Sequence, residues 1–167
     1  NADPAVKDLP INVYPKGSYA NRTNVRADSD VDINVEYTGM FFYQLTHELE
    51  GKSGADIGIE PASGTDPGPV EFKNLIEGAL VKAFGRGAVE RQNKAIELHE
   101  QSNRLAADVV PCYTHHRYER QTLLANPTPL VGTQLFPDSG GEVINWPKQH
   151  YENGVSKNTA TSRCFKA

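Results

Sequence analysis

The sequence predicts an α+β fold in a single compact domain. Runs that alternate or are continuously apolar, which are typical of strands, recur along the chain, whereas residues 72–83 carry apolar side chains at helical spacing. The length of 167 residues is enough for one domain with a sizeable core, and a hydrophobic fraction of 38% is ordinary for a globular protein. We therefore expect strands and helices that pack around one core.

Charge and cysteine content restrict the function classes. A net charge of −4 gives no general basic field for gripping a long nucleic acid, although it leaves room for a local basic pocket. The two cysteines, Cys112 and Cys164, lie far apart, which indicates a reducing compartment rather than a disulfide framework. No apolar run approaches the length of a membrane span. We expect a cytoplasmic protein that binds neither a membrane nor a long nucleic acid.

The N-terminal part predicts two strands separated by a turn. Residues 3–10 are polar and contain prolines, so they are interpreted as a lead-in. Residues 11–14 alternate like a short strand, which Pro15 ends. Gly17-Ser18 then predicts a turn that leads towards a second strand over residues 29–35.

The middle of the chain predicts helices joined by a loop. A helix is expected to begin within residues 38–50, because Phe41, Phe42, Leu45 and Leu49 suit one apolar face. Residues 51–70 contain five glycines and three prolines and predict a flexible loop. The helix over 72–83 follows and is expected to pack on the core.

The C-terminal part predicts strands and a last helix. Residues 89–98 and 105–113 each read as a strand, and residues 133–136 and 142–146 flank a hairpin turn. Residues 156–167 are interpreted as the start of a connecting helix that the chain end interrupts.

Two carboxylates lie on the strand over residues 29–35. Asp30 and Asp32 share one face of it, because successive side chains of a strand point to opposite sides. Carboxylates this close repel each other, and a divalent cation is the usual way to keep both ionised. The Gly17-Ser18 turn ahead of them offers backbone N–H groups and a hydroxyl to a phosphate. Together these features favour phosphoryl or nucleotidyl transfer.

The same residues carry a family resemblance. Gly17-Ser18 followed by Asp30-x-Asp32 resembles the signature of the DNA-polymerase-β-type nucleotidyltransferases. The extended run Gly-Ser-Tyr-Ala-Asn-x-Thr and Ser-Asp-Val-Asp is most similar to the bacterial cGAS/DncV-like oligonucleotide cyclases of antiphage signalling. The resemblance runs from about residue 14 to residue 167. It implies a nucleotidyltransferase fold, in which helices pack on a mixed twisted sheet that carries the catalytic carboxylates.

Asp108 is the third candidate carboxylate. A carboxylate inside an otherwise apolar strand is costly unless it is paired, hydrogen-bonded or bound to a metal. Taken alone, Asp108 fits an edge-strand residue facing water equally well. The resemblance implies that residues 108–111 are the third-carboxylate motif of the family. Asp30, Asp32 and Asp108 would then hold Mg²⁺ or Mn²⁺, and Asp108 would either accept a proton or only bind the metal.

The resemblance also implies a reaction. Ser18 and the N–H groups after Gly17 would hold the terminal phosphates, while an acceptor hydroxyl attacks the α-phosphate and pyrophosphate leaves. The expected product is a cyclic or short linear oligonucleotide, made from ATP, GTP or both as an antiviral signal. Two alternatives stay open: transfer to a separate acceptor (a protein, a tRNA end or an antibiotic), and nucleotide binding without catalysis. The sequence identifies no regulatory protein partner.

Lys157 is the candidate cation near the phosphates. Its segment resembles the one that leads into the helix after the family's catalytic sheet, but a solvated lysine in a first helical turn fits equally well. Cys112, His115 and His116 are close in sequence, yet a closed zinc site needs four ligands and no second ligand pair is present.

The chain departs from the family pattern at both ends. Members usually have a long helix ahead of the Gly-Ser turn, and here only 16 residues precede it. They also continue into a C-terminal helical lobe, which is expected to be absent or truncated here. We therefore expect residues 1–167 to form a nucleotidyltransferase catalytic core.

Overall fold

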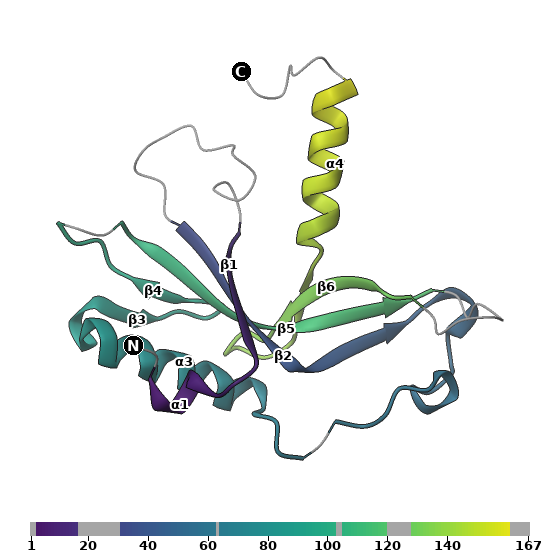
Figure 1. The fold of residues 1–167 in the computed structure, drawn as a ribbon, viewed down its shortest axis with the longest axis horizontal. Coiled ribbons are helices and arrows are strands. Elements are labelled where there is room, and N and C mark those ends of the chain that lie inside the picture. The colour runs from purple at the N-terminus through teal and green to yellow at the C-terminus, as the bar shows by residue number, and fades with distance from the viewer. Residues whose placement is uncertain (1–2, 17–30, 63, 103–104, 120–127, 161–167) are drawn as a thin grey trace.

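A seven-stranded mixed sheet forms the body of the protein (Figure 1). The computed structural model describes residues 3–16, 31–62, 64–102, 105–119 and 128–160, to which every structural statement below refers. The mixed sheet and the packed helix confirm the α+β prediction. The strands are β1 (Ile11–Pro15), β2 (Val31–Leu45), β3 (Val89–Arg91), β4 (Ile96–Leu98), β5 (Ala107–Tyr118), β6 (Leu130–Leu135) and β7 (Val143–Asn145).

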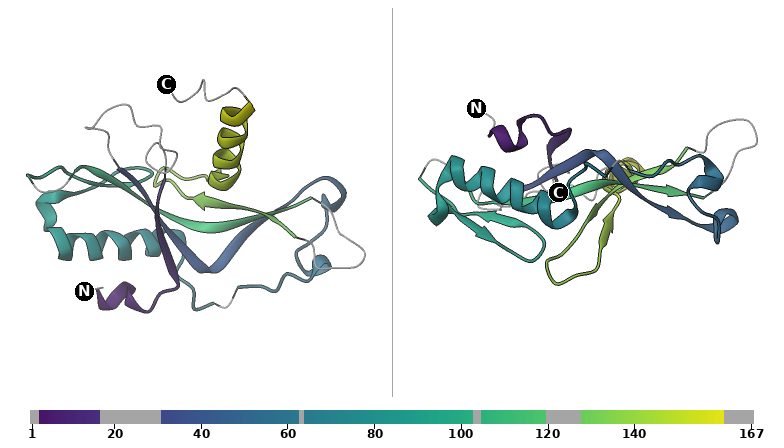
Figure 2. Two further views of the ribbon diagram at one scale, coloured as in Figure 1. Left: turned by 45° about the horizontal axis from the view of Figure 1, so that its top comes forward. Right: turned by 90° about the horizontal axis from the view of Figure 1, so that it is seen from below.

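The two long central strands, β2 and β5, pair in parallel, and the other pairs are antiparallel. Along the sheet the order is β1-β2-β5-β4-β3, while β6 pairs with the far part of β5 and carries β7. The β2–β5 register shifts between Tyr37 and Phe41. Because β4 pairs with the first part of β5 and β6 with its second part, the sheet has two halves that share β2 and β5 (Figures 1 and 2).

The prediction that a helix begins within residues 38–50 is wrong. β2 continues to Leu45 and is followed by a short 3₁₀ turn, His47–Leu49. The run from Tyr37 to Tyr43 is rich in aromatic residues, which favour strands, and β5 supplies backbone partners along this whole length.

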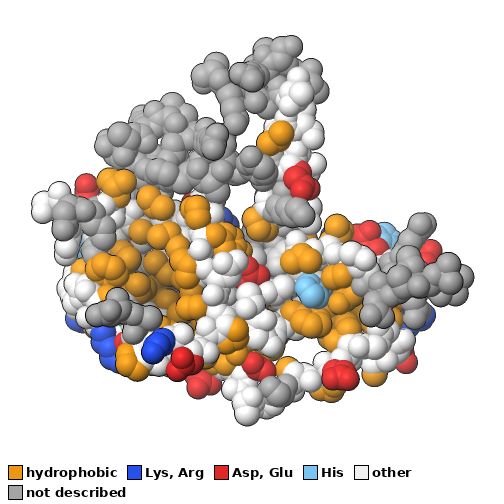
Figure 3. All heavy atoms as spheres, in the orientation of Figure 1, with side chains coloured by type: hydrophobic (Ala, Val, Ile, Leu, Met, Phe, Trp, Pro, Cys, Tyr) orange, Lys and Arg blue, Asp and Glu red, His pale blue; other side chains and the backbone are white. Residues whose placement is uncertain are grey.

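The helix α3 (Pro69–Phe84) covers one face of the half of the sheet that contains β3 and β4, which confirms the helix expected over 72–83 (Figure 2). Phe72 of α3 packs against Tyr37 of β2 and Tyr113 of β5, with ring centroids 5.4 Å from each. A short helix, α1 (Pro4–Lys7), lies beside α3 where a lead-in was expected, and its Val6 joins the same core (Figure 2). Hydrophobic side chains gather over this part of the molecule (Figure 3).

The glycine-rich segment 51–70 has few regular elements but several anchors. The hydroxyl of Tyr37 donates to Asp66 Oδ1 at 2.7 Å, and that of Tyr113 donates to the carbonyl of Pro67 at 2.8 Å. Within the segment, Ala55–Ile57 form one 3₁₀ turn. The expected flexibility stays a prediction.

The segments after α3 differ from expectation in two places. The single strand expected over 89–98 is the hairpin β3–β4, closed by a hydrogen bond from Gln92 N to Ala95 O at 3.0 Å. The last helix, α4 (Pro147–Ala160), begins at Pro147 rather than near Ser156 and stands away from the sheet (Figure 1). Proline suits a first helical position, so the helix starts there and continues through Gly154. The hairpin β6–β7 is as expected.

No helix in the part of the chain that the structure describes is both long and apolar enough to cross a membrane.

Candidate active site

Two of the three candidate carboxylates lie side by side. Asp32, at the start of β2, is the register partner of Asp108, at the start of β5. Partners on adjacent strands project from the same face of a sheet, so the two carboxylates share one face, and both residues are half-buried. The other predicted site residues of this end, Gly17, Ser18 and Asp30, lie outside the described residues.

The alternation along β2 explains why this face is polar. Val31 and Ile33 point to the opposite face, where they pack on the core together with Val35. Their partners across β5 include Ala107 and Val109, which are buried in the same cluster. The expected packing of Val31, Ile33 and Val35 on the apolar face is confirmed, whereas the place of Asp30 beside Asp32 stays a prediction.

A further carboxylate adjoins the pair. Glu97 of β4 is the register partner of Asp108 on its other side, so Asp32, Asp108 and Glu97 form a row across three strands. Ligand atoms of Glu97, Glu90 and His99 lie within 4.8 Å of one another. Such a concentration of negative charge favours a bound cation. The sequence did not single out Glu97, because only the pairing of β4 with β5 places it beside Asp108.

The polar face continues along β2 beyond Asp32. Asn34 and Glu36 follow at alternate positions and are buried, with 1% and 9% of their surface exposed. Glu36 accepts hydrogen bonds from the hydroxyls of Tyr14 at 3.0 Å and Thr114 at 2.8 Å. Burial raises the pKa of Tyr14, so its hydroxyl stays protonated and donates to Glu36. Asn34 and Glu36 could have been found from the sequence, because polar residues stand at every second position after Asp32.

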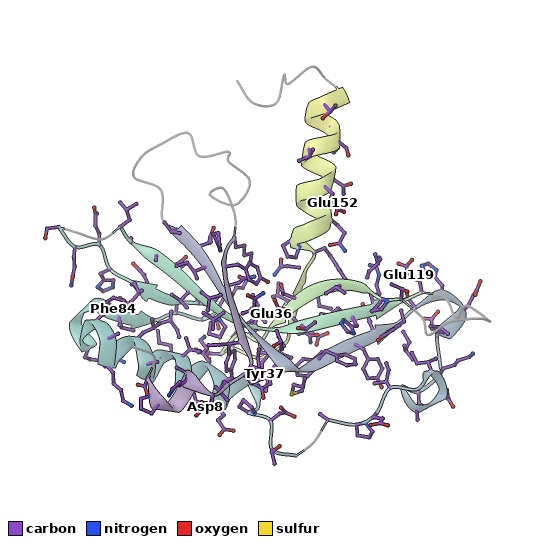
Figure 4. All side chains as sticks on the ribbon, in the orientation of Figure 1. Asp8, Glu36, Tyr37, Phe84, Glu119 and Glu152 are labelled. Atoms are coloured by element: carbon purple, nitrogen blue, oxygen red, sulfur yellow. The ribbon has the colours of Figure 1, made fainter. Side chains whose placement is uncertain are left out.

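A pocket opens on the same face of the sheet. It has a volume of about 340 Å³ and lies between β1, β2, β6 and the first residue of α4. Glu36 contributes to its wall and lies near the middle of the sheet (Figure 4). The lining residues are Asn12, Tyr14, Glu36, Val131, Gly132, Thr133 and Pro147.

Cys112, His115 and His116 each have their own surroundings. Burial raises the pKa of the Cys112 thiol to about 12, which leaves it protonated and unreactive at neutral pH. Nδ1 of His115 lies 2.6 Å from Gln134 Oε1, whereas the ring of His116 stacks on Phe41 with centroids 4.3 Å apart. Consecutive strand residues point to opposite faces, so the two imidazoles do not converge.

Lys157 is exposed and lies in the last turn of α4. Because this helix begins at Pro147, Lys157 is not in a first turn, as one interpretation of the sequence expected. Its role near the phosphates stays a prediction.

Comparison with known proteins places this site in context. No protein-family model matches the sequence. Over 166 residues the chain is 40% identical to the cyclic dipyrimidine nucleotide synthase CdnE of Cecembia lonarensis, covering 99% of this chain and 52% of that protein. The cyclic GMP-AMP synthase CdnE03 of Staphylococcus schleiferi is 37% identical over 160 residues, covering 96% and 48%. This chain is a relative of the CdnE-type, cGAS/DncV-like nucleotidyltransferases.

Solved CdnE structures share the fold. The c-UMP-AMP synthase CdnE of Rhodothermus marinus, solved with Apcpp and Upnpp, matches with a TM-score of 0.76 and 31% identity over 97% of this chain and 54% of that one. The CdnE of Elizabethkingia meningoseptica, solved with GTP and Apcpp, matches with a TM-score of 0.68 and 33% identity, covering 94% and 48%. The resemblance inferred from the sequence motifs is therefore confirmed.

The curated CdnE relatives differ from one another in the bases that they are named for, and from this chain in length. They are nucleotide synthases by name, and their names give different bases: two pyrimidines in one, guanine and adenine in another. The chain spans about half the length of the curated relatives it matches.

Proposed function

We propose that this chain is the catalytic core of a metal-dependent nucleotidyltransferase. It would join nucleoside triphosphates into a cyclic or short linear oligonucleotide messenger for antiviral signalling and release pyrophosphate. The observation that supports this most is the register pairing of Asp32 with Asp108, in a chain related to cyclic nucleotide synthases. We further propose ATP, GTP or both as substrates.

Asp30, Asp32 and Asp108 would hold the metal ion, Mg²⁺ or Mn²⁺. The fit rests on the paired carboxylates of Asp32 and Asp108, because hard divalent cations prefer oxygen ligands and relieve the repulsion between them. When bound, the metal stabilises negative charge on the transferring phosphoryl group and lowers the pKa of the attacking hydroxyl.

The remaining roles follow from the sequence motifs. Gly17 and Ser18 would bind the triphosphate through backbone N–H groups and a hydroxyl. Lys157 would supply positive charge near the phosphates. The same site would also allow two alternative functions: transfer to a separate acceptor, and nucleotide binding without catalysis.

Product analysis separates these functions. The chain is incubated with all four nucleoside triphosphates and Mg²⁺ or Mn²⁺, and the products are identified by mass spectrometry together with pyrophosphate release. We expect an oligonucleotide from the bare triphosphates, which Asp108→Asn abolishes. The exposed Asp8→Asn is the matched control and should change nothing. Product from the wild type and Asp108→Asn at equal rates would refute the assignment of the site.

A further inference from the structure

The pocket beside Glu36 combines features of a small-molecule subsite. Val131 and Pro147 give it apolar walls, while Tyr14, Glu36 and Thr133 add polar groups. Its volume of about 340 Å³ falls at the lower end of the range for ligand pockets, roughly 300–1,000 Å³. A buried carboxylate in such a wall is costly unless it receives hydrogen bonds.

Glu36 keeps acceptor capacity after its internal bonds are counted. Tyr14 donates to Oε2 and Thr114 donates to Oε1, so each carboxylate oxygen has one described protein partner. Because a carboxylate offers about four acceptor positions, each oxygen can accept another hydrogen bond. These two donors also fix the orientation of the carboxylate, which then presents its remaining acceptor positions in a defined direction.

The pocket lies in line with the carboxylate pair. Asp32, Asn34 and Glu36 alternate along one face of β2, and at about 3.3 Å per residue Asp32 and Glu36 are about 13 Å apart along the strand. That span is of the same order as the length of a nucleoside. A ligand whose sugar or phosphates lie at Asp32 and Asp108 can therefore extend its base towards Glu36.

Asn34 adds an independent observation between these two ends. It is 1% exposed, and its Nδ2 donates to the hydroxyl of Tyr14 at 3.3 Å. Its buried Oδ1 has no hydrogen-bond partner among the described residues. Buried polar atoms are nearly always satisfied, so this oxygen marks a place for a donor from outside the described residues, such as a water between the carboxylate pair and the pocket.

We propose that this pocket is a nucleobase subsite and that Glu36 makes it prefer a base with an exocyclic amino group over one with a carbonyl at the same position. The inference rests on the proposed function, because it places the sugar and phosphates at Asp32 and Asp108. Cytosine and uracil are the matched pair. The 4-amino group of cytosine donates to a carboxylate, whereas the 4-carbonyl of uracil is an acceptor and is repelled by it.

Titration calorimetry with the α,β-imido analogues of CTP and UTP, in Mg²⁺, tests this inference. The wild type should bind the cytidine analogue at least about tenfold more tightly, since hydrogen bonds to charged groups contribute roughly 1.5–3 kcal/mol. In Glu36→Gln the single amide oxygen accepts from one of the two hydroxyls, of Tyr14 or Thr114, and the NH2 group replaces the other acceptor oxygen with a donor. The ratio of the two affinities should therefore fall towards one.

A second substitution tests the location of the subsite without altering Glu36. Val131 lines the pocket and is 46% exposed, so Val131→Phe should fold and fill the space. We expect it to weaken both analogues. Val13→Phe is the matched control, because Val13 is an exposed strand valine, 58% exposed, that does not line the pocket. It should bind both analogues as the wild type does.

The outcomes separate this inference from the proposed function. Mg²⁺-dependent binding with the same ratio in wild type and Glu36→Gln, or with full affinity in Val131→Phe, would overturn the subsite and leave the proposed function intact. The absence of Mg²⁺-dependent binding of any nucleoside triphosphate to the wild type would overturn both.

Discussion

Asp32 and Asp108 place like charges on directly paired residues of adjacent strands. Like charges in this position destabilise a sheet, by an amount comparable to the roughly 0.2–1 kcal/mol that cross-strand pairs contribute. The chain keeps both on its two central strands, where an apolar pair would be more stable. The proposed cation binding would account for this cost.

Asp32→Asn should therefore have opposite effects on stability and on metal binding. Without metal, removing one charge should leave the free energy of unfolding unchanged or raise it by up to about 1 kcal/mol. The additional stability conferred by Mg²⁺ together with ATP should be lost, because an amide is a poorer ligand for this ion. Urea unfolding with and without Mg²⁺ and ATP measures both. A variant that is less stable without metal and still responds to Mg²⁺ would contradict the assignment.

Single site residues could be predicted from the sequence where they belong to a local motif. Asp30, Asp32 and Asp108 follow from two short motifs, and the structure brings Asp32 and Asp108 together. Glu36 could have been found from its polar, two-residue spacing after Asp32. Glu97 could not be predicted in this way, because its position beside Asp108 depends on the pairing of β4 with β5, which no local pattern contains.

Between elements, a charged network joins α3, the β3–β4 hairpin and the turn before β7. The ammonium of Lys73, whose side chain is 5% exposed, lies 2.9 Å from Asp138 Oδ2 and donates to the carbonyls of Gln92 and Asn93. Arg91 binds both oxygens of Asp138 at 2.8 Å. The network holds the hairpin and the turn to the helix, and so supports the strand that carries Glu97.

Because of this network, the free energy of unfolding should depend on pH in the acidic range. Hydrogen bonds from Arg91, then Lys73, lower the pKa of Asp138 to about 2, whereas the unfolded chain has the ordinary value of about 3.9. The stabilisation is therefore complete above about pH 4 and is lost as the pH falls towards 2. Asp138→Asn should be less stable than the wild type at pH 6, and the difference should shrink at pH 2.5. Urea unfolding at both values measures it; a constant difference would contradict the network.

The junction between β7 and α4 depends on a close contact at Gly132. A Cβ there would lie 2.5 Å from the carbonyl oxygen of Asn145 and 2.7 Å from the ring of Trp146. Trp146 also lies under the guanidinium of Arg117, 4.8 Å from its ring centroid. Gly132 therefore allows the start of α4 to pack on β6.

Gly132→Ala should destabilise the protein by about 1–3 kcal/mol, as overpacking usually does, and should change the fluorescence of Trp146. Trp146 is the single tryptophan of the chain, so its emission reports on this junction directly. Gly78→Ala, in α3 with nothing within 4 Å, is the control and should stabilise by about 0.5–1 kcal/mol. Unchanged fluorescence and stability in Gly132→Ala would show that the contact is not required.

Element boundaries were less predictable than element types. The strands around Ile11–Pro15 and Val143–Asn145 and the helix α3 follow from hydrophobic spacing and turn residues. The second half of β2 was mistaken for a helix, because its Phe and Leu spacing fits both periods and β5 decides between them. The sequence places the start of α4 too late, because Asn153-Gly154 suggests a turn, whereas the helix begins at Pro147 and continues through Gly154.

For the whole molecule, the fold class was predicted from the motifs more securely than from hydrophobic patterns. The solved CdnE structures share the fold of this chain, and the chain spans about half the length of the relatives it matches. The proposed function depends on whether this chain binds nucleotides through its paired carboxylates.

Thermal denaturation with a nucleoside triphosphate tests that claim most directly. At a hundredfold excess over the dissociation constant, binding should stabilise the wild type by about 2.7 kcal/mol, and only when Mg²⁺ or Mn²⁺ is present. Asp32→Asn and Asp108→Asn should lose this response, whereas Asp8→Asn should keep it. An equal rise in melting temperature in excess chelator, or in both carboxylate variants, would contradict the proposed site.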